Sequence, residues 1–186
     1  DESGEAVGEP TECALVNWAT RLNLAKASLE RNTPRIEEAP FDSMRKMMST
    51  LHKAEGGIVQ YTKGAPDEVL KRCTAYLKDG QELPLTDAVR AEILAANKAM
   101  ADQALRVLCA ARRSYAALPA DLTPAALEQE LTFLGLAGMI DPIRPEVKAA
   151  IEECRTAGIR PVMITGDHRD TAVAIAKQLG ILTDER

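Results

Sequence analysis

Residues 58–68 constrain the fold of this chain more than any other stretch, because they combine a strand, a turn of small residues and the start of a helix. Residues 58–62 are mostly β-branched or aromatic, which favours a strand. The positions that follow are Lys63, Gly64, Ala65, Pro66, Asp67 and Glu68. Proline and carboxylates are favoured in the first turn of a helix, so a helix is predicted from Pro66. Lys63 would then lie beside a surface formed by the small residues Gly64 and Ala65, which suits a flat ligand with an anionic tail. An ordinary turn with a solvated lysine is the alternative for this stretch alone.

Apolar content and net charge limit the classes of protein to which this chain can belong. The 186 residues are 46% apolar, which is enough for a buried core. Net charge is −5 and no strongly basic stretch occurs, so no nucleic-acid partner is expected. No apolar run approaches the roughly 20 residues that cross a bilayer, and the acidic N-terminus is unlike a signal peptide. Only 3% of the residues are aromatic, so Phe41 carries more information than an aromatic usually does.

Cysteine and histidine usage argues against a metal centre. The cysteines are Cys13, Cys73, Cys109 and Cys154, and no two form a C-x-x-C pair. We therefore expect reduced, buried or half-buried thiols of a cytosolic protein. Neither histidine, His52 or His168, has ligand spacing to a cysteine, so no metal site is expected.

Residues 1–140 carry both helical and strand patterns. A 3.6-residue apolar period predicts a helix over residues 10–24, and Thr86 is expected to cap a long helix. Residues 44–51 are predicted to pair with residues 58–63 through a turn at Gly56-Gly57. The other predictions are an extended segment over 33–41, a short helix over 67–73, a buried strand over 105–111, a helix opened by Thr123-Pro124 and a strand over 131–140.

The chain changes character near Asp141. A proline-rich joint over residues 141–145 precedes a helix over 146–158, a buried strand over 160–164 and a second helix over 168–179. This order predicts a β-α unit of a doubly wound parallel sheet. Thr165-Gly166-Asp167 follows the strand, where such sheets bind their ligands. We therefore place one domain over residues 1–140 and part of another over residues 141–186.

Six segments together resemble the type II P-type cation-transporting ATPases, which include the calcium pumps and their bacterial relatives. They occur in the family's order and span nearly the whole chain. The segments are residues 8–15, residues 41–49, Lys63-Gly64-Ala65-Pro66, Leu105-Arg106-Val107-Leu108, Asp141-Pro142-Ile143-Arg144 and Thr165-Gly166-Asp167.

The resemblance implies an α+β fold. Residues 1–140 would form the nucleotide-binding domain, a twisted antiparallel sheet flanked by helices. Residues 141–186 would form part of the phosphorylation domain, a partial α/β segment similar to haloacid-dehalogenase-type folds.

The resemblance also implies roles for individual residues. Phe41 would stack on adenine, and aromatic stacking of a base contributes about 1–3 kcal/mol. Glu12 would accept a hydrogen bond from the adenine amino group. Lys63 would line the adenine and ribose side of the pocket, where Gly64 and Ala65 would leave room for the ring. Lys46 and Arg106 would meet the phosphates through charge-assisted hydrogen bonds.

The remaining implied roles concern the joint and the tail. Thr165 and Gly166 would contact the transferring phosphoryl group in the complete pump, and Asp167 would help to bind the nucleotide there. Asp141 and Arg144 would form the hinge between the domains. Two positions depart from the family pattern: Ser43 stands where calcium pumps usually carry a further arginine, and Ile143 where a second proline is common.

The sequence lacks the parts that would accept the phosphoryl group. It contains no Asp-Lys-Thr-Gly-Thr segment and no Gly-Asp-Gly-x-Asn-Asp segment. Phosphoryl transfer depends on a positioned nucleophile and on metal ions. We therefore expect a fragment of a pump that binds ATP without forming a phosphoenzyme, with Mg²⁺ arriving on the nucleotide and most of its ligands outside this chain.

The expected partners are ATP and the remaining phosphorylation, actuator and transmembrane domains of the same pump, at the cytoplasmic face of a membrane. The strand over residues 160–164 would lack sheet neighbours, so its edge is expected to pair with another chain or to repack on the nucleotide domain.

Two other hypotheses for the function of the chain stay open. One is a haloacid-dehalogenase-type phosphatase, which would need an upstream Asp-x-Asp-like nucleophile that is absent. The other is a non-catalytic interaction domain that binds no nucleotide.

Overall fold

The computed structural model describes residues 6–140, 143–165 and 169–182. Its main feature is a seven-stranded sheet in the order β1-β2-β3-β6-β7-β4-β5. The strands are β1 Arg35–Asp42, β2 Met47–Ala54, β3 Gly57–Gly64, β4 Cys73–Lys78, β5 Gln81–Pro84, β6 Arg106–Tyr115 and β7 Leu131–Met139. The helices are α1 Pro10–Arg21, α2 Lys26–Asn32, α3 Pro66–Lys71, α4 Asp87–Ala101, α5 Pro124–Leu127, α6 Pro145–Thr156 and α7 Arg169–Gln178.

The predicted hairpin is confirmed. β2 pairs with β3 in antiparallel register from Met47–Gly64 to Ala54–Gly57, and the turn at Glu55 and Gly56 leads directly into Gly57. Both glycines have positive φ, at 82° and 152°, a region that glycine enters at little cost. The helix predicted from Pro66 is confirmed as α3, and the long helix after Thr86 as α4. The Thr86 hydroxyl accepts from the Val89 amide at 3.4 Å, in keeping with its predicted capping role.

The sheet is mixed, which corrects the expectation of a wholly antiparallel sheet. β1, β2, β3 and β6 are antiparallel neighbours. β4, however, pairs in parallel with β7. Parallel neighbours need a long crossover connection, and here β5, α4, β6 and α5 separate the two strands along the chain. An α+β arrangement of helices flanking a sheet is therefore present with one parallel pair inside it.

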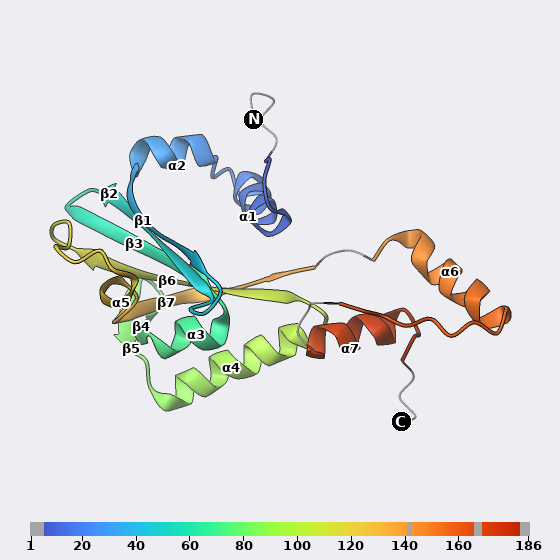
Figure 1. Ribbon diagram of the computed structural model, residues 1–186. Helices are drawn as coiled ribbons and strands as arrows, with labels where there is room; N and C mark the ends of the chain where they lie inside the picture. The colour runs from blue at the N-terminus through green and yellow to red at the C-terminus, as the bar shows by residue number, and fades with distance from the viewer. Residues whose placement is uncertain (1–5, 141–142, 166–168, 183–186) are drawn as a thin grey trace. The chain divides into compact units, whose positions relative to one another are not determined.

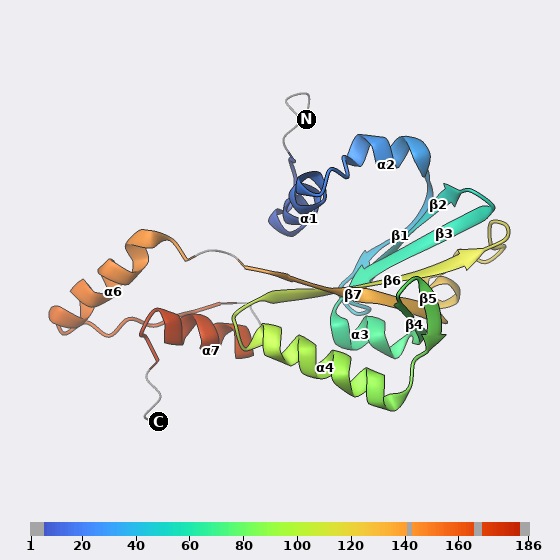
Figure 2. The same ribbon diagram turned by 180° about the vertical axis from the view of Figure 1, so that it is seen from behind.

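Helices cover both faces of the β1–β3 part of the sheet. α1 and α2 lie on one face, and α3 and α5 lie on the other (Figure 1; seen from behind in Figure 2). Strand alternation explains the division, because successive side chains point to opposite faces. On β2, Met47 and Leu51 are fully buried, whereas Met48 and Thr50 between them are half-buried. Leu51 belongs to a core cluster with Ala39 of β1 and Leu127 of α5.

The chain divides into two compact units. One comprises residues 1–90 and 108–137, and the other comprises residues 91–107 and 138–186. The predicted boundary near Asp141 stays a prediction, and Asp141 itself lies outside the described residues. Across residues 6–140, 143–165 and 169–182, no helix combines the length and the hydropathy of a membrane span.

The structure differs from the predicted secondary structure in three places. The first helix ends at Arg21, and a separate helix, α2, follows it. β4 and β5 were not predicted. Residues 160–164, expected to be a buried strand, form neither strand nor helix, and Ile164 is 93% exposed. A strand requires a neighbour for its backbone hydrogen bonds, and apolar composition alone does not supply one. The helices predicted around this segment are present as α6 and α7, while its haloacid-dehalogenase-like character stays a prediction.

The four thiols differ in burial. Burial raises the pKa of the Cys73 thiol from 9.0 to about 12, and it also raises the pKa of Cys109. At pH 8 a pKa rise from 9 to 12 lowers the thiolate fraction on the order of a thousandfold. We expect Cys13 and Cys154, which are half-buried, to react with a disulfide reagent in the folded chain, and Cys73 and Cys109 to react only in denaturant. Mass spectrometry of the labelled peptides checks this, and four equal rates would contradict it.

Candidate functional site

A cavity of about 290 Å³ lies on the sheet face that α1 covers. Leu15 of α1, Met48 and Thr50 of β2, and Tyr61 and Lys63 of β3 contribute to its lining. The β6 part is formed by residues 108–111, which are one leucine followed by a cysteine and two alanines with small side chains. The cavity therefore has a largely apolar floor, with one aromatic side chain and one lysine from the same strand and a second cation, Arg35, from β1.

Lys63 is held at the cavity by an ion pair with Glu12. The Lys63 ammonium donates to the Glu12 carboxylate in the first turn of α1, 51 residues away along the chain. The Lys63 side chain is 30% exposed and that of Glu12 is 51% exposed. The structure thus brings together two residues that the sequence assigned to the same pocket. Each of the two side chains satisfies the charge of the other.

A β-bulge places Phe41 in the same cross-strand row as Lys63. Between the Ala39 and Asp42 pairs with β2, two β1 residues stand opposite the single residue Met48, and Phe41 is one of the two. Met48 pairs in turn with Lys63. Bulges change the direction in which side chains point. Phe41 is 63% exposed and does not line the cavity, and two strand spacings of about 4.8 Å separate its strand from that of Lys63.

Lys46, Gly64 and Ala65 meet where β2 begins and β3 ends. The Lys46 carbonyl accepts from the Ala65 amide at 2.9 Å, and Lys46 itself is exposed with φ at 55°. A Cβ on Gly64 would lie 2.4 Å from the Lys46 carbonyl oxygen and 2.6 Å from the Met47 Cβ. The small residue at position 64 is therefore required first by the close approach of two backbones.

The Asp42 turn organises the residues between β1 and β2. The Asp42 carboxylate accepts from the amides of Met44 at 2.9 Å and Arg45 at 3.0 Å, and the Asp42 carbonyl accepts from the Lys46 amide at 2.7 Å. Such local side-chain hydrogen bonds stabilise tight turns. Phe41 and Lys46 thus flank one closed turn.

The other predicted residues are not brought into this cluster. Arg106 begins β6, and both it and Arg144, at the N-cap of α6, are exposed; they belong to the second unit. Thr165 is exposed and belongs to that unit too. Asp141, Gly166 and Asp167 lie outside the described residues. The roles of all six stay predictions.

Sequence reasoning missed two features of the site. Tyr61 lines the cavity, and its position two residues before Lys63 on a strand could have indicated a shared face. The second feature is an ion pair between Arg45 and the buried Glu128, which are 83 residues apart. No local signal connects two such distant positions.

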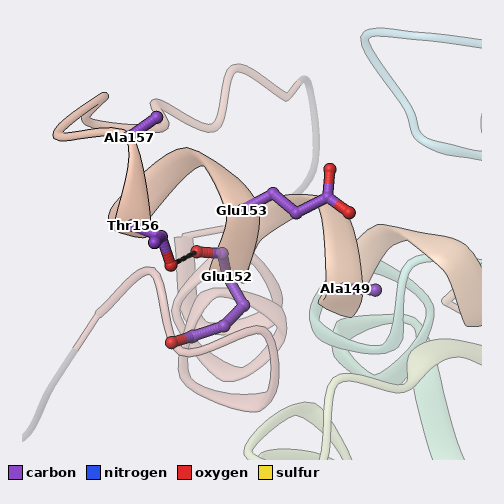
Figure 3. Close-up of a pocket in the computed structure, with 5 residues that line it drawn as sticks. All are labelled: Ala149, Glu152, Glu153, Thr156 and Ala157. Atoms are coloured by element: carbon purple, nitrogen blue, oxygen red, sulfur yellow. Dashed lines mark hydrogen bonds between the residues drawn. The ribbon is translucent and has the colours of Figure 1, made fainter.

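A larger hollow of about 580 Å³ is less suited to an anionic ligand. Figure 3 shows that its lining comes from α6 and the residue that follows it, at Ala149, Glu152, Glu153, Thr156 and Ala157. The lining carries two carboxylates and no cation, so it would repel phosphate. Within the described parts of the chain, no three histidine, cysteine, aspartate or glutamate side chains gather as a metal site would require.

A mixed sheet flanked by helices, with a small cavity over one face, defines an α+β domain. Residues 1–146 match the sequence profile of the family described as P-type ATPase, cytoplasmic domain N. The chain therefore belongs to the P-type ATPase family, as the resemblance had implied.

Three relatives illustrate the similarity. Calcium-transporting ATPase 1 of Bacillus cereus is 52% identical over 177 residues, which cover 95% of this chain and 20% of the relative. The calcium-transporting ATPase of Bacillus subtilis is 45% identical over 178 residues, covering 94% and 20%. A calcium-transporting ATPase of Listeria monocytogenes is 42% identical over 184 residues, covering 98% and 21%. The chain thus spans about a fifth of the length of these relatives.

Proposed function

We propose that this chain binds ATP and presents it for phosphoryl transfer to an aspartate outside the chain, as the nucleotide-binding part of a cation-transporting pump. The observation that carries the proposal is the cavity lined by Lys63 and Tyr61, with Glu12 paired to Lys63 at its edge. The family match supports the class of protein, and the cavity supports the location of the ligand.

The size and chemistry of the cavity favour the nucleoside end of ATP. Small-molecule pockets usually measure about 300–1,000 Å³, and the volume here, about 290 Å³, lies at the lower limit. A base and a ribose are of that scale, whereas the triphosphate would extend beyond it. Glu12 can accept from the adenine amino group once the nucleotide separates it from Lys63. Phe41, exposed in the same row as Lys63, is available to stack on the base.

The triphosphate would be met by cations outside the cavity. Lys46 lies on the turn beside Phe41 and is exposed, and Arg106 is the second residue proposed for this role. Mg²⁺ would arrive on the nucleotide, with most of its ligands supplied outside this chain. Thr165, Gly166 and Asp167 would act at the phosphoryl group in the complete pump, and Asp141 with Arg144 would form the hinge.

The names of the three relatives favour calcium as the transported cation. Its binding site would lie in another part of the pump. The remaining domains of the same pump are the proposed partners.

We expect Phe41→Ala to weaken ATP binding by about five- to 150-fold, the equivalent of the about 1–3 kcal/mol that base stacking contributes. Lys63→Ala should weaken it roughly tenfold, because a charge-assisted contact is lost. Calorimetric titration with ATP, with and without Mg²⁺, measures both effects.

Two variants serve as controls for this titration. Lys78→Ala removes an exposed lysine at the end of β4, and Leu118→Ala removes an exposed apolar side chain, so both should bind ATP as the unsubstituted chain does. Saturable binding that neither Phe41→Ala nor Lys63→Ala weakens would place the nucleotide elsewhere. A folded chain that shows no binding at millimolar ATP would favour the interaction-domain hypothesis.

A further inference from the structure

A buried carboxylate lies beneath the turn that carries Phe41 and Lys46. The side chain of Glu128 is 1% exposed, although glutamate is rarely buried without a partner. Its Oε1 accepts from the Arg45 guanidinium and from the Ser49 hydroxyl, the latter at 3.4 Å. Its Oε2 is buried and has no hydrogen-bond partner. The short helix α5 ends at Leu127, directly before Glu128, and so positions this carboxylate against the sheet.

Arg45 connects the carboxylate to the turn. One guanidinium nitrogen, Nη1, bonds to Glu128, and the other, Nη2, donates to the Pro40 carbonyl at 2.7 Å. Pro40 directly precedes Phe41, and Arg45 directly precedes Lys46. The planar guanidinium therefore joins both ends of the turn to one buried anchor, in the fixed geometry for which arginine is suited. We call this arrangement of Arg45 and Glu128 the clamp.

A buried polar network holds the anchor in turn. Ser49 and Thr62 share a hydrogen bond of 2.8 Å between β2 and β3. The Gln60 amide donates to Thr62 at 2.9 Å and to the Leu127 carbonyl at 3.0 Å. These hydrogen bonds fix Ser49, whose hydroxyl in turn donates to Glu128 at 3.4 Å. The position of Glu128 is thereby tied to β2 and β3, and β3 also carries Lys63.

We propose that Glu128, acting through Arg45, is a positioning residue that holds the turn over residues 41–46 in the form that presents Phe41 and Lys46 to the nucleotide. This inference rests on the proposed ATP binding and adds a determinant of affinity that does not touch the ligand. Buried ion pairs frequently contribute little to stability compared with apolar residues of similar volume. In this structure the ion pair instead fixes the position of the backbone, because Arg45 also donates to the Pro40 carbonyl, directly before Phe41.

The first test is Glu128→Gln, which keeps the shape of the side chain and removes its charge. We expect ATP affinity to fall roughly tenfold, with amide hydrogen exchange at Met44, Arg45 and Lys46 becoming faster before any nucleotide is added. The matched control is Glu130→Gln. Glu130 lies two residues after Glu128 and is ion-paired with Arg113 instead of Arg45, so affinity should not change.

A double variant separates positioning from stability. Arg45→Met with Glu128→Leu removes both charges, so the unfolding midpoint should lie close to that of the unsubstituted chain, whereas Arg45→Met alone leaves a buried charge and should lower it strongly. ATP affinity should stay reduced roughly tenfold in the double variant, because the hydrogen bond to the Pro40 carbonyl is still missing. Arg45→Lys with Glu128 intact should not restore full affinity either, since lysine cannot join both partners in one plane.

The outcomes distinguish this inference from the function on which it rests. If the unsubstituted chain binds ATP and Phe41→Ala weakens it, while Glu128→Gln and the double variant bind normally, the clamp is a structural ion pair only and the inference is wrong. Recovery of affinity together with stability in the double variant would lead to the same conclusion. If the folded unsubstituted chain does not bind ATP, both the proposed function and the inference are wrong.

Discussion

Replacement of Gly64 with alanine is expected to destabilise the chain and to abolish most ATP binding. The added Cβ would lie 2.4 Å from the Lys46 carbonyl oxygen and within 2.7 Å of Met47, and both are backbone or near-backbone atoms that cannot rotate away. Forcing volume into a closely packed site costs about 1–3 kcal/mol or more. The strain should separate β2 from β3, break the hydrogen bond from the Ala65 amide to Lys46, and displace the turn that carries Phe41.

Gly135→Ala is the matched control for this prediction. Gly135 also lies within a strand, β7, but a Cβ there would meet nothing within 4 Å, and its φ is not in the left-handed region. Alanine should therefore be neutral or stabilise by about 0.4–1 kcal/mol, through the lower entropy of the unfolded chain. Urea unfolding and ATP titration of the two variants provide the comparison. Equal stability of Gly64→Ala and Gly135→Ala would show that β2 and β3 can separate without cost.

Leu51→Ala should produce the second large effect, a loss of about 2–5 kcal/mol in the free energy of unfolding. Leu51 is fully buried and packs with Ala39 and Leu127, so truncation removes apolar burial and leaves a cavity. For a chain of this length, the melting temperature should fall by roughly 2–4 °C per kcal/mol. Thermal unfolding followed by circular dichroism measures the change.

The control for this truncation is Leu118→Ala, which removes the same atoms from a side chain that is 48% exposed. Surface substitutions usually change stability by less than about 0.5 kcal/mol. A melting temperature for Leu51→Ala that matches that of Leu118→Ala would mean that the α5 side of the sheet does not form the core. Because Leu127 directly precedes Glu128, a severe loss at Leu51 should also loosen the clamp.

Residues close together in the sequence were sufficient to predict much of the fold. The β2–β3 hairpin follows from its glycine turn, and the helix at Pro66 follows from proline and carboxylates in its first turn, so both could be predicted from neighbours in sequence. β4 and β5 could not, because they are short and carry no strong alternation, and β4 depends on β7 for its pairing. Residues 160–164 were predicted wrongly for the converse reason: their apolar pattern favours burial, but a strand also needs a partner.

Some residues of the candidate site could likewise be predicted from the sequence, and others were found only in the structure. Lys63 and Gly64 were identified from their place at the end of a strand, and Glu12 and Phe41 from the family pattern. The bulge that aligns Phe41 with Lys63 depends on the register between β1 and β2, which no periodicity in the sequence reports. Tyr61 was accessible to reasoning, since alternate residues of a strand share a face, whereas the pairing of Arg45 with Glu128 was not.

The amino-acid sequence by itself determined the family, through six segments in order along the chain. It also determined the strand–turn–helix around Lys63 and most of the helices, because these depend on residue types within one or two turns of the chain. The tertiary structure alone decided the parallel pair in the sheet, the ion pair between Glu12 and Lys63, and the clamp beneath the Phe41 turn. Those features join residues that lie 51 to 83 positions apart. Contacts at such separations form only when the sheet brings its strands together, so packing rather than local preference sets them.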